Sequence, residues 1–213
     1  MSGPRPSSLL SAKLLGYLAA IITVSIWAAF LVGTRFAITK NFSVEEILIL
    51  RLLPAAIIMA PLMLHLGILP PGNNLITRVI FALGASALFP WVLSVGLYYS
   101  PASNAGALAP GTLPFWTALI AYLIVHEKPE FSRQIGLFII LFGAILIGIL
   151  KLDADIANLT WVGNILFLLG AALWAIYSVL FRQSGIAPLH GLVIGLFWGL
   201  SLIHISEPTR QLC

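Results

Sequence analysis

The chain has 213 residues, of which 60% are hydrophobic and only 8% are charged, and its mean hydropathy is +1.05. Soluble domains carry about 25% charged residues, so this composition excludes a water-soluble globular protein. The formal net charge of +4 comes from basic residues scattered between apolar runs, which is typical of membrane topology and not of nucleic-acid binding. We therefore expect a lipid bilayer around the chain and no nucleic acid as a partner.

Several apolar runs are long enough to cross a membrane, which takes about 20 mostly apolar residues. Six runs qualify, and a seventh begins near Pro188. Because a backbone in lipid must satisfy its own hydrogen bonds, the runs predict an all-α integral membrane protein, a polytopic helix bundle. The six runs are Leu14–Phe36, Val44–Leu66, Leu75–Tyr99, Asn104–Val125, Gln134–Leu150 and Trp161–Phe181.

The first and sixth runs share a pattern at an offset of 147 positions, at which Trp27 falls on Trp174 and Arg35 falls on Arg182. Gly16 falls on Gly163 at the same offset. Four runs lie between these two, so the repeat unit holds five spans, and the second copy would insert upside down, as in inverted-repeat transporters. We therefore predict inverted five-helix repeats, of which the second is incomplete.

These boundaries divide the chain into a cytoplasmic N-terminal segment (1–13), a first repeat (14–151), the start of a second repeat (152–199) and a tail (200–213). The stretch from Leu200 to Arg210 resembles the translation of a transposase adapter used in sequencing libraries. On that interpretation the native sequence ends near Gly199. The alternative is a short amphipathic tail.

The distribution of basic residues predicts the orientation. The first run is too long for a cleaved signal segment, so we expect it to remain as a span. We expect a multi-pass protein of the cell (cytoplasmic, or inner) membrane with a cytoplasmic N-terminus, because most basic residues then lie inside. The inner segments would carry Arg5, Lys13, Arg78, Lys128, Arg133 and Arg182, and the outer segments Lys40 and Lys151.

Arg51 is the most unusual single residue, because it lies about two turns inside the second run. A charge in the hydrocarbon costs about 2.5–3.5 kcal/mol unless it snorkels or faces a cavity. One interpretation is snorkelling to the outer interface. The other is a cavity residue that pairs with an anionic substrate group or with an acid from another helix.

Prolines and tryptophans inside the spans are further cavity candidates. Pro110 and Pro114 would leave carbonyl groups free near the middle of the fourth run, either at a packing kink or along a cavity. Trp27, Trp116 and Trp174 fit lipid contact or packing when taken singly. Because the repeat pairs Trp27 with Trp174, these two also suggest a site on the repeat axis.

The segment Ser43–Glu46 reads as a capping box at the start of the second run. The alternative is an outer gate in which Glu45 or Glu46 pairs with Arg35. Gly136 and Gly143 are seven positions apart in the fifth run, and we interpret them as helix-packing residues.

Catalysis is not predicted. The histidines His65, His126 and His190 have no matched nucleophile or metal-ligand spacing, and no phosphate-binding glycine loop occurs. We therefore expect no enzyme activity, no cofactor and no metal.

Short motifs in the right order resemble the drug/metabolite transporter superfamily, and within it the EamA-domain proteins. They are the Trp27 segment, Ile-Leu-Arg51-Leu-Leu-Pro-Ala-Ala, the turn from Tyr98 to Leu108, Pro114, Glu127-Lys128, and Gly136 with Gly143. Ala28 departs from the family's usual glycine.

The resemblance implies ten spans in two inverted repeats, a substrate cavity between them, and alternating-access transport of small metabolites such as amino acids. The chain holds one repeat and part of the second. The alternative function is a half-size membrane subunit that acts with a partner, including a second copy in a homodimer, or that has no transport activity of its own.

Overall fold

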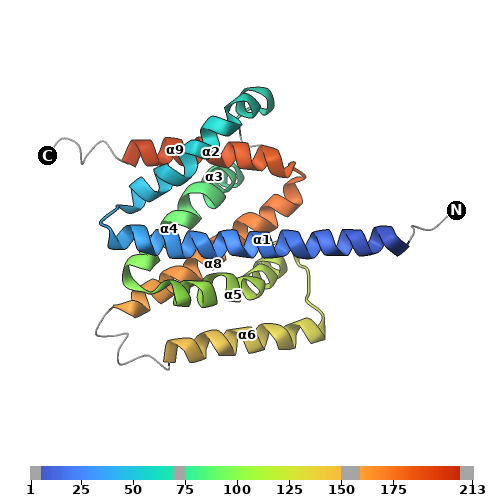
Figure 1. The fold of residues 1–213 in the computed structure, drawn as a ribbon. Helices are drawn as coiled ribbons and strands as arrows, with labels where there is room; N and C mark the ends of the chain where they lie inside the picture. Colours follow the sequence, from blue (N-terminus) through green and yellow to red (C-terminus); the bar gives the residue numbers. More distant parts are fainter. Residues whose placement is uncertain (1–5, 70–74, 150–158, 207–213) are drawn as a thin grey trace.

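The computed structural model describes residues 6–69, 75–149 and 159–206, which fold into helices with no strand among them (Figure 1). The prediction of an all-α polytopic membrane protein is confirmed. In chain order the helices are α1 (Pro6–Thr39), α2 (Val44–Leu66), α3 (Leu75–Leu83), the π-helical turn η1 (Gly84–Leu88), α4 (Phe89–Tyr99), α5 (Ala102–Ile120), the π-helical turn η2 (Ala121–Val125), α6 (Phe131–Ile149), α8 (Thr160–Ser184) and α9 (Pro188–Ser206).

The predicted apolar runs correspond to these helices. Five described stretches are long and apolar enough to cross a membrane, and α6 and α9 are shorter apolar helices. Three predicted features lie outside the described residues: the last residue of the fifth run (150), the boundary between the repeats (151 and 152), and the end of the tail (207–213). The five stretches are Lys13–Thr39, Val44–Leu66, Arg78–Tyr99, Ala102–Val125 and Thr160–Ser184.

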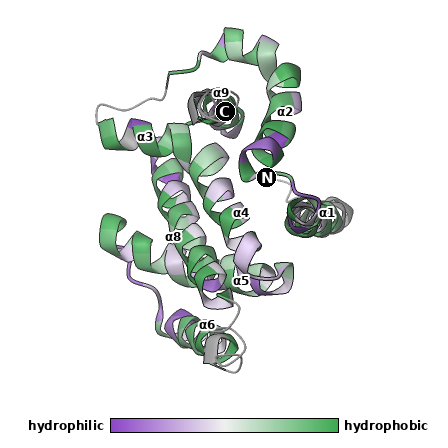
Figure 2. Ribbon diagram, turned by 90° about the vertical axis from the view of Figure 1, so that its left-hand side faces the viewer, coloured by the Kyte–Doolittle hydropathy of each residue, from purple (hydrophilic) through white to green (hydrophobic). Residues whose placement is uncertain are grey.

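Helix α8 lies at the centre of the bundle. Its most extensive contacts are with α4 and α5, and Figure 2 shows α1 and α6 at the periphery. Leu93, Leu97 and Phe167 have no solvent-exposed surface and form the core between these helices. A second apolar cluster joins α2 to α9 through residues that include Leu48 and Leu196. The peripheral helices expose large apolar side chains, which suits them to contact lipid.

The packing glycines are not the ones predicted. A Cβ atom on Gly136 or Gly143 would meet nothing within 4 Å, so the interpretation of these two as packing residues is wrong. Helix α6 turns other residues toward its neighbour α5, and Gly136 and Gly143 face open space. The close approach is instead between α4 and α8, where a Cβ on Gly163 would lie 2.6 Å from the Gly96 carbonyl oxygen. Glycine at both positions lets the two backbones come together.

The backbone irregularity also differs from the expectation. Helix α5 remains α-helical through Pro110 and Pro114, so the two prolines do not unwind it. Each proline removes only one backbone bond, whereas unwinding would expose several polar groups in lipid. One π-helical turn is η1, where the Phe89 amide donates to the Gly84 carbonyl and Pro90 follows. A π-helical turn next to a proline is a common way to absorb its missing hydrogen bond.

Candidate functional site

A cavity of about 390 Å³ lies among α1, α2, η1, α4, α8 and α9. It brings together three of the predicted site residues, Trp27, Arg51 and Trp174, which come from three different helices. The remaining lining residues are mostly apolar or aromatic: Leu52, Ala55, Ala85, Ser86, Phe89, Pro90, Tyr177, Phe181, Pro188, Gly191, Leu192 and Leu196.

The aromatic side chains form a continuous wall. The ring centroids of Trp27 and Trp174 are 5.8 Å apart in an edge-to-face arrangement at 81°. Trp174 also lies 4.8 Å from Phe89 and 5.7 Å from Tyr177, centroid to centroid. Such pairs add about 0.5–1.5 kcal/mol each beyond their area burial, so the wall is held together by its own contacts.

Arg51 supplies the formal charge of this cavity. Its guanidinium carbon lies 4.1 Å from the centroid of the Phe30 ring, which is a cation–π contact. Among the described residues the Arg51 side chain has no carboxylate partner and no hydrogen bond. A cation held by an aromatic ring, without an acid beside it, can accept an anionic group from a ligand.

The turn η1 contributes the polar residue Ser86 to the cavity, and it brings Gly84 against α8. A Cβ on Gly84 would lie 3.0 Å from Tyr177 Cδ2, so glycine allows this close contact. Sequence reasoning missed η1 as part of the site. The signal for it was Pro90, which follows a segment of small residues, Gly84-Ala85-Ser86-Ala87.

Comparison with known families gives one finding. The profile of the EamA-like transporter family matches residues 14–149. This chain belongs to the EamA-like transporter family. The chain is thus a multi-pass membrane protein of a transporter family, and the match covers nearly the same residues as the predicted first repeat, 14–151. No curated protein and no solved structure shows a significant match to it.

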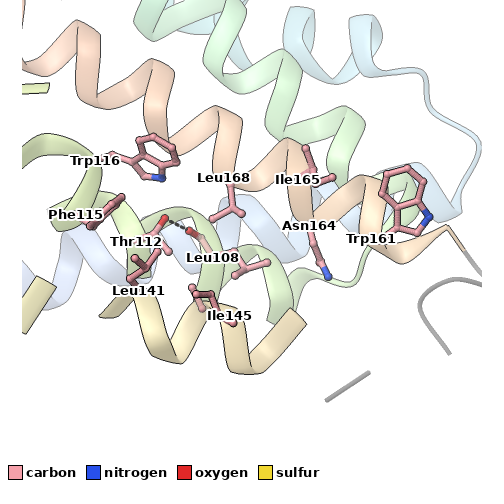
Figure 3. Close-up of a pocket in the computed structure, with 11 residues that line it drawn as sticks. Leu108, Thr112, Phe115, Trp116, Leu141, Ile145, Trp161, Asn164, Ile165 and Leu168 are labelled. Carbon is pink, nitrogen blue, oxygen red and sulfur yellow. Dashed lines mark hydrogen bonds between the residues drawn. The ribbon is translucent and has the colours of Figure 1, made fainter. Parts of the chain in front are cut away.

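In this EamA-like chain, Trp116 lies away from the other two predicted tryptophans. It lines a second, apolar cavity of about 290 Å³ between α5, α6 and α8, together with Thr112, Leu168 and Ile145 (Figure 3). The buried Trp116 Nε1 has no hydrogen-bond partner among the described residues. Trp116 therefore does not share the Arg51 cavity.

The two predicted prolines line neither of these cavities. Between them, the Thr112 hydroxyl donates to the Leu108 carbonyl at 2.5 Å. This back-bond is local to the helix and does not involve the carbonyls of Gly106 and Pro110, which lose their amide donors to the two prolines.

The capping box at α2 is present, and the proposed outer gate pair is not formed. The Glu46 amide donates to Ser43 Oγ at 3.2 Å, and Glu46 Oε2 accepts from the Ser43 amide at 2.8 Å. Arg35 donates instead to the carbonyls of Leu97 and Tyr98 at the end of α4. Glu45 accepts from Trp91 Nε1 at 3.4 Å. In this arrangement Arg35 ties α1 to α4, and a gating role for Arg35, Glu45 and Glu46 stays a prediction.

Sequence reasoning missed a buried polar cluster at the same end of α4. Ser100 Oγ donates to Asn164 Oδ1 at 2.8 Å, and Asn104 Nδ2 lies 3.2 Å from both oxygens. All three side chains are buried. The available signal was Asn164, an amide in an otherwise apolar run. These bonds join α5 to α8, and Asn164 also lines the apolar cavity between α5, α6 and α8.

Proposed function

We propose that this EamA-like chain moves small organic metabolites that carry an acidic group, such as amino acids or related compounds, across the cell membrane. Transport would be secondary and would proceed by alternating access. The observation that carries the proposal is the position of Arg51, a cation with no acid beside it, in a cavity walled by Trp27 and Trp174.

The chemistry of the cavity supports an amphipathic substrate. A carboxylate can pair with the Arg51 guanidinium, which presents several N–H donors in a fixed fork. The apolar part of the substrate can lie against the aromatic wall formed by Trp27, Trp174 and Tyr177. In a medium of low dielectric constant this ion pair is stronger than in water, which favours capture of the anion.

The cavity also fits alternating access. It is bounded by helices from the predicted first repeat and by α8 and α9, which begin the predicted second repeat. In inverted-repeat transporters the substrate lies between the repeats, and rocking of one against the other exposes it to each side. We propose a cytoplasmic N-terminus, since most basic residues then lie on the inner side.

A second candidate is a half-size subunit that acts with a second copy. The family match at residues 14–149 spans one predicted repeat, which is the unit that such a subunit would contribute. Co-purification of two differently tagged copies would support this candidate, and a monomer that transports alone would exclude it.

The test is counterflow of a panel of labelled metabolites into proteoliposomes that contain the chain. Arg51→Gln should lower the transport of anionic or zwitterionic substrates by about tenfold or more, equivalent to about 1.4 kcal/mol, since hydrogen bonds to charged groups contribute about 1.5–3 kcal/mol. Lys40→Gln is the matched control, because it removes one exposed charge that lies over the Phe36 ring. Equal transport by both variants would remove Arg51 from the site.

A further inference from the structure

Two neighbouring hollows lie where η2 ends and the chain turns toward α6. One is a groove of about 370 Å³ between α5 and α6. The other is a small hollow of about 90 Å³ between α5, the turn and α8. Both are lined by Ala118, Lys128 and Pro129, so they adjoin each other at Lys128.

The two hollows differ in chemistry. The groove is lined mainly by the apolar and aromatic side chains of Phe115, Leu119, Tyr122 and Leu137. Its amide residue is already engaged, because Gln134 Nε2 donates to the Pro129 carbonyl at 2.9 Å. The small hollow is lined by three basic side chains, Lys128, Arg133 and Arg182, and by one acid, Glu127.

The acid is occupied by one of these cations. Arg182 Nη2 lies 2.7 Å from Glu127 Oε2. The side chains of Lys128 and Arg133 form no ion pair or hydrogen bond within the described part of the chain. The other acid of the turn, Glu130, lines neither hollow. The small hollow therefore keeps an excess of positive charge.

The local backbone fixes this arrangement. The π-helical turn η2 ends at His126, which has a left-handed conformation with φ 59°. The turn is then held to α6 by the bond from Gln134 to Pro129 and to α8 by the Glu127–Arg182 pair. Lys128 thus lies at the head of the groove, with Arg133 and Arg182 beside it.

We propose that these two hollows together bind one anionic phospholipid. Its phosphate would lie among Lys128, Arg133 and Arg182, and one acyl chain would lie in the groove between α5 and α6. The groove lies between α5 and α6, and α6 is at the periphery of the bundle (Figure 2), where a bilayer supplies acyl chains. Basic hollows next to membrane helices recognise anionic headgroups in this way. The inference depends on the membrane assignment and is independent of any transported substrate.

The experiment measures lipid binding to the purified chain by native mass spectrometry from neutral detergent. Phosphatidylglycerol should bind more tightly than phosphatidylcholine with the same acyl chains. Lys128→Gln should weaken phosphatidylglycerol binding by about fivefold, since one basic side chain near the surface contributes about that factor. Lys40→Gln, which removes one exposed charge outside both hollows, should leave binding unchanged.

Further arms separate a lipid site from a simple anion site. Inorganic phosphate alone should compete only weakly, because it leaves the groove empty. Phosphatidylglycerol with shortened acyl chains should bind less tightly than the long-chain lipid. Equal binding of both headgroups, equal effects of the two lysine variants, or full competition by phosphate would overturn the proposal. Circular dichroism of each variant checks that the helices are retained.

Discussion

The two ends of α8 pack in different ways, and the difference separates structure from candidate function. Near Gly163, α8 lies so close to α4 that a Cβ atom would be 2.5 Å from Ser100 Cβ, and the polar groups there satisfy one another. Near Trp174, aromatic side chains hold the helices apart around a cavity that contains Arg51. The Gly163 end fixes the helices, and the Trp174 end leaves room for a ligand.

The contrast follows from the residue types. Glycine brings backbones together, and small polar side chains then reach across the contact. Tryptophan and tyrosine fill volume but cannot interdigitate completely around a charged side chain, so space remains beside them. Substitutions at each end should therefore have different consequences, and four predictions examine this difference.

The largest loss of stability is expected for Trp174→Ala. It removes ring contacts with Trp27, Phe89 and Tyr177, and we expect the free energy of unfolding to fall by about 3 kcal/mol. Trp161→Ala is the matched control, because Trp161 is 46% exposed and contacts no aromatic ring of the residues that the structure describes. Reversible unfolding in mixed micelles measures both. Equal losses in the two variants would contradict the aromatic wall.

Gly163→Ala should destabilise the tight end by about 2 kcal/mol, because the added methyl group would overlap Ser100 and the Gly96 carbonyl. Gly136→Ala adds the same group to α6, where nothing lies within 4 Å. Alanine is also the better helix former, so this control should be neutral or slightly stabilising. If both variants unfold alike, the close α4–α8 contact is not formed.

Ser100→Ala should cost about 1–2 kcal/mol, since it leaves the Asn104 and Asn164 amides short of a partner. Ser94→Ala changes the same residue type in α4, and Ser94 Oγ is buried without a partner in the described structure. Its removal should cost nothing. A larger loss at Ser94 than at Ser100 would argue against the polar cluster, and the same unfolding assay decides it.

The smallest effect is expected for Glu127→Gln, which breaks the pair with Arg182. Both side chains are more than half exposed, at 54% and 59%, so the change in unfolding free energy should stay below about 1 kcal/mol. Added salt should shrink it further. A loss that is both large and insensitive to salt would show that this pair is shielded from solvent.

Sequence reasoning predicted the helices well, because long apolar runs in lipid allow almost no other structure. It also selected Trp27, Arg51 and Trp174, which the fold brings to one cavity. The internal repeat pointed to Trp27 and Trp174, because it places the two at equivalent positions. The energetic cost of a charge inside the hydrocarbon pointed to Arg51.

It was less successful where the outcome depends on helix rotation. Gly136 can pack against a neighbouring helix only if its face of α6 is turned toward α5. Because α6 is apolar all round, neither the periodicity nor the composition of its sequence predicts which face is turned that way. The same holds for Trp116, which α5 directs into a different cavity. The π-helical turn at η1 depends on how a proline bond is absorbed, and several local structures can do this.

The most direct test of the central claim is whether the Arg51 cavity admits water and prefers anions. In a Cys213→Ser background, which removes the one cysteine of the sequence, Ser86→Cys places a thiol on the cavity and Ser94→Cys places one in the closed part of α4. Each variant is treated with anionic and cationic methanethiosulfonates of similar size.

We predict that the thiol at position 86 reacts much faster than the thiol at position 94 and that it prefers the anionic reagent. It should lose this preference when Arg51→Gln is added. Equal, slow reaction at both positions, or a preference for the cationic reagent, would contradict the proposal that this cavity is an anion-binding transport site.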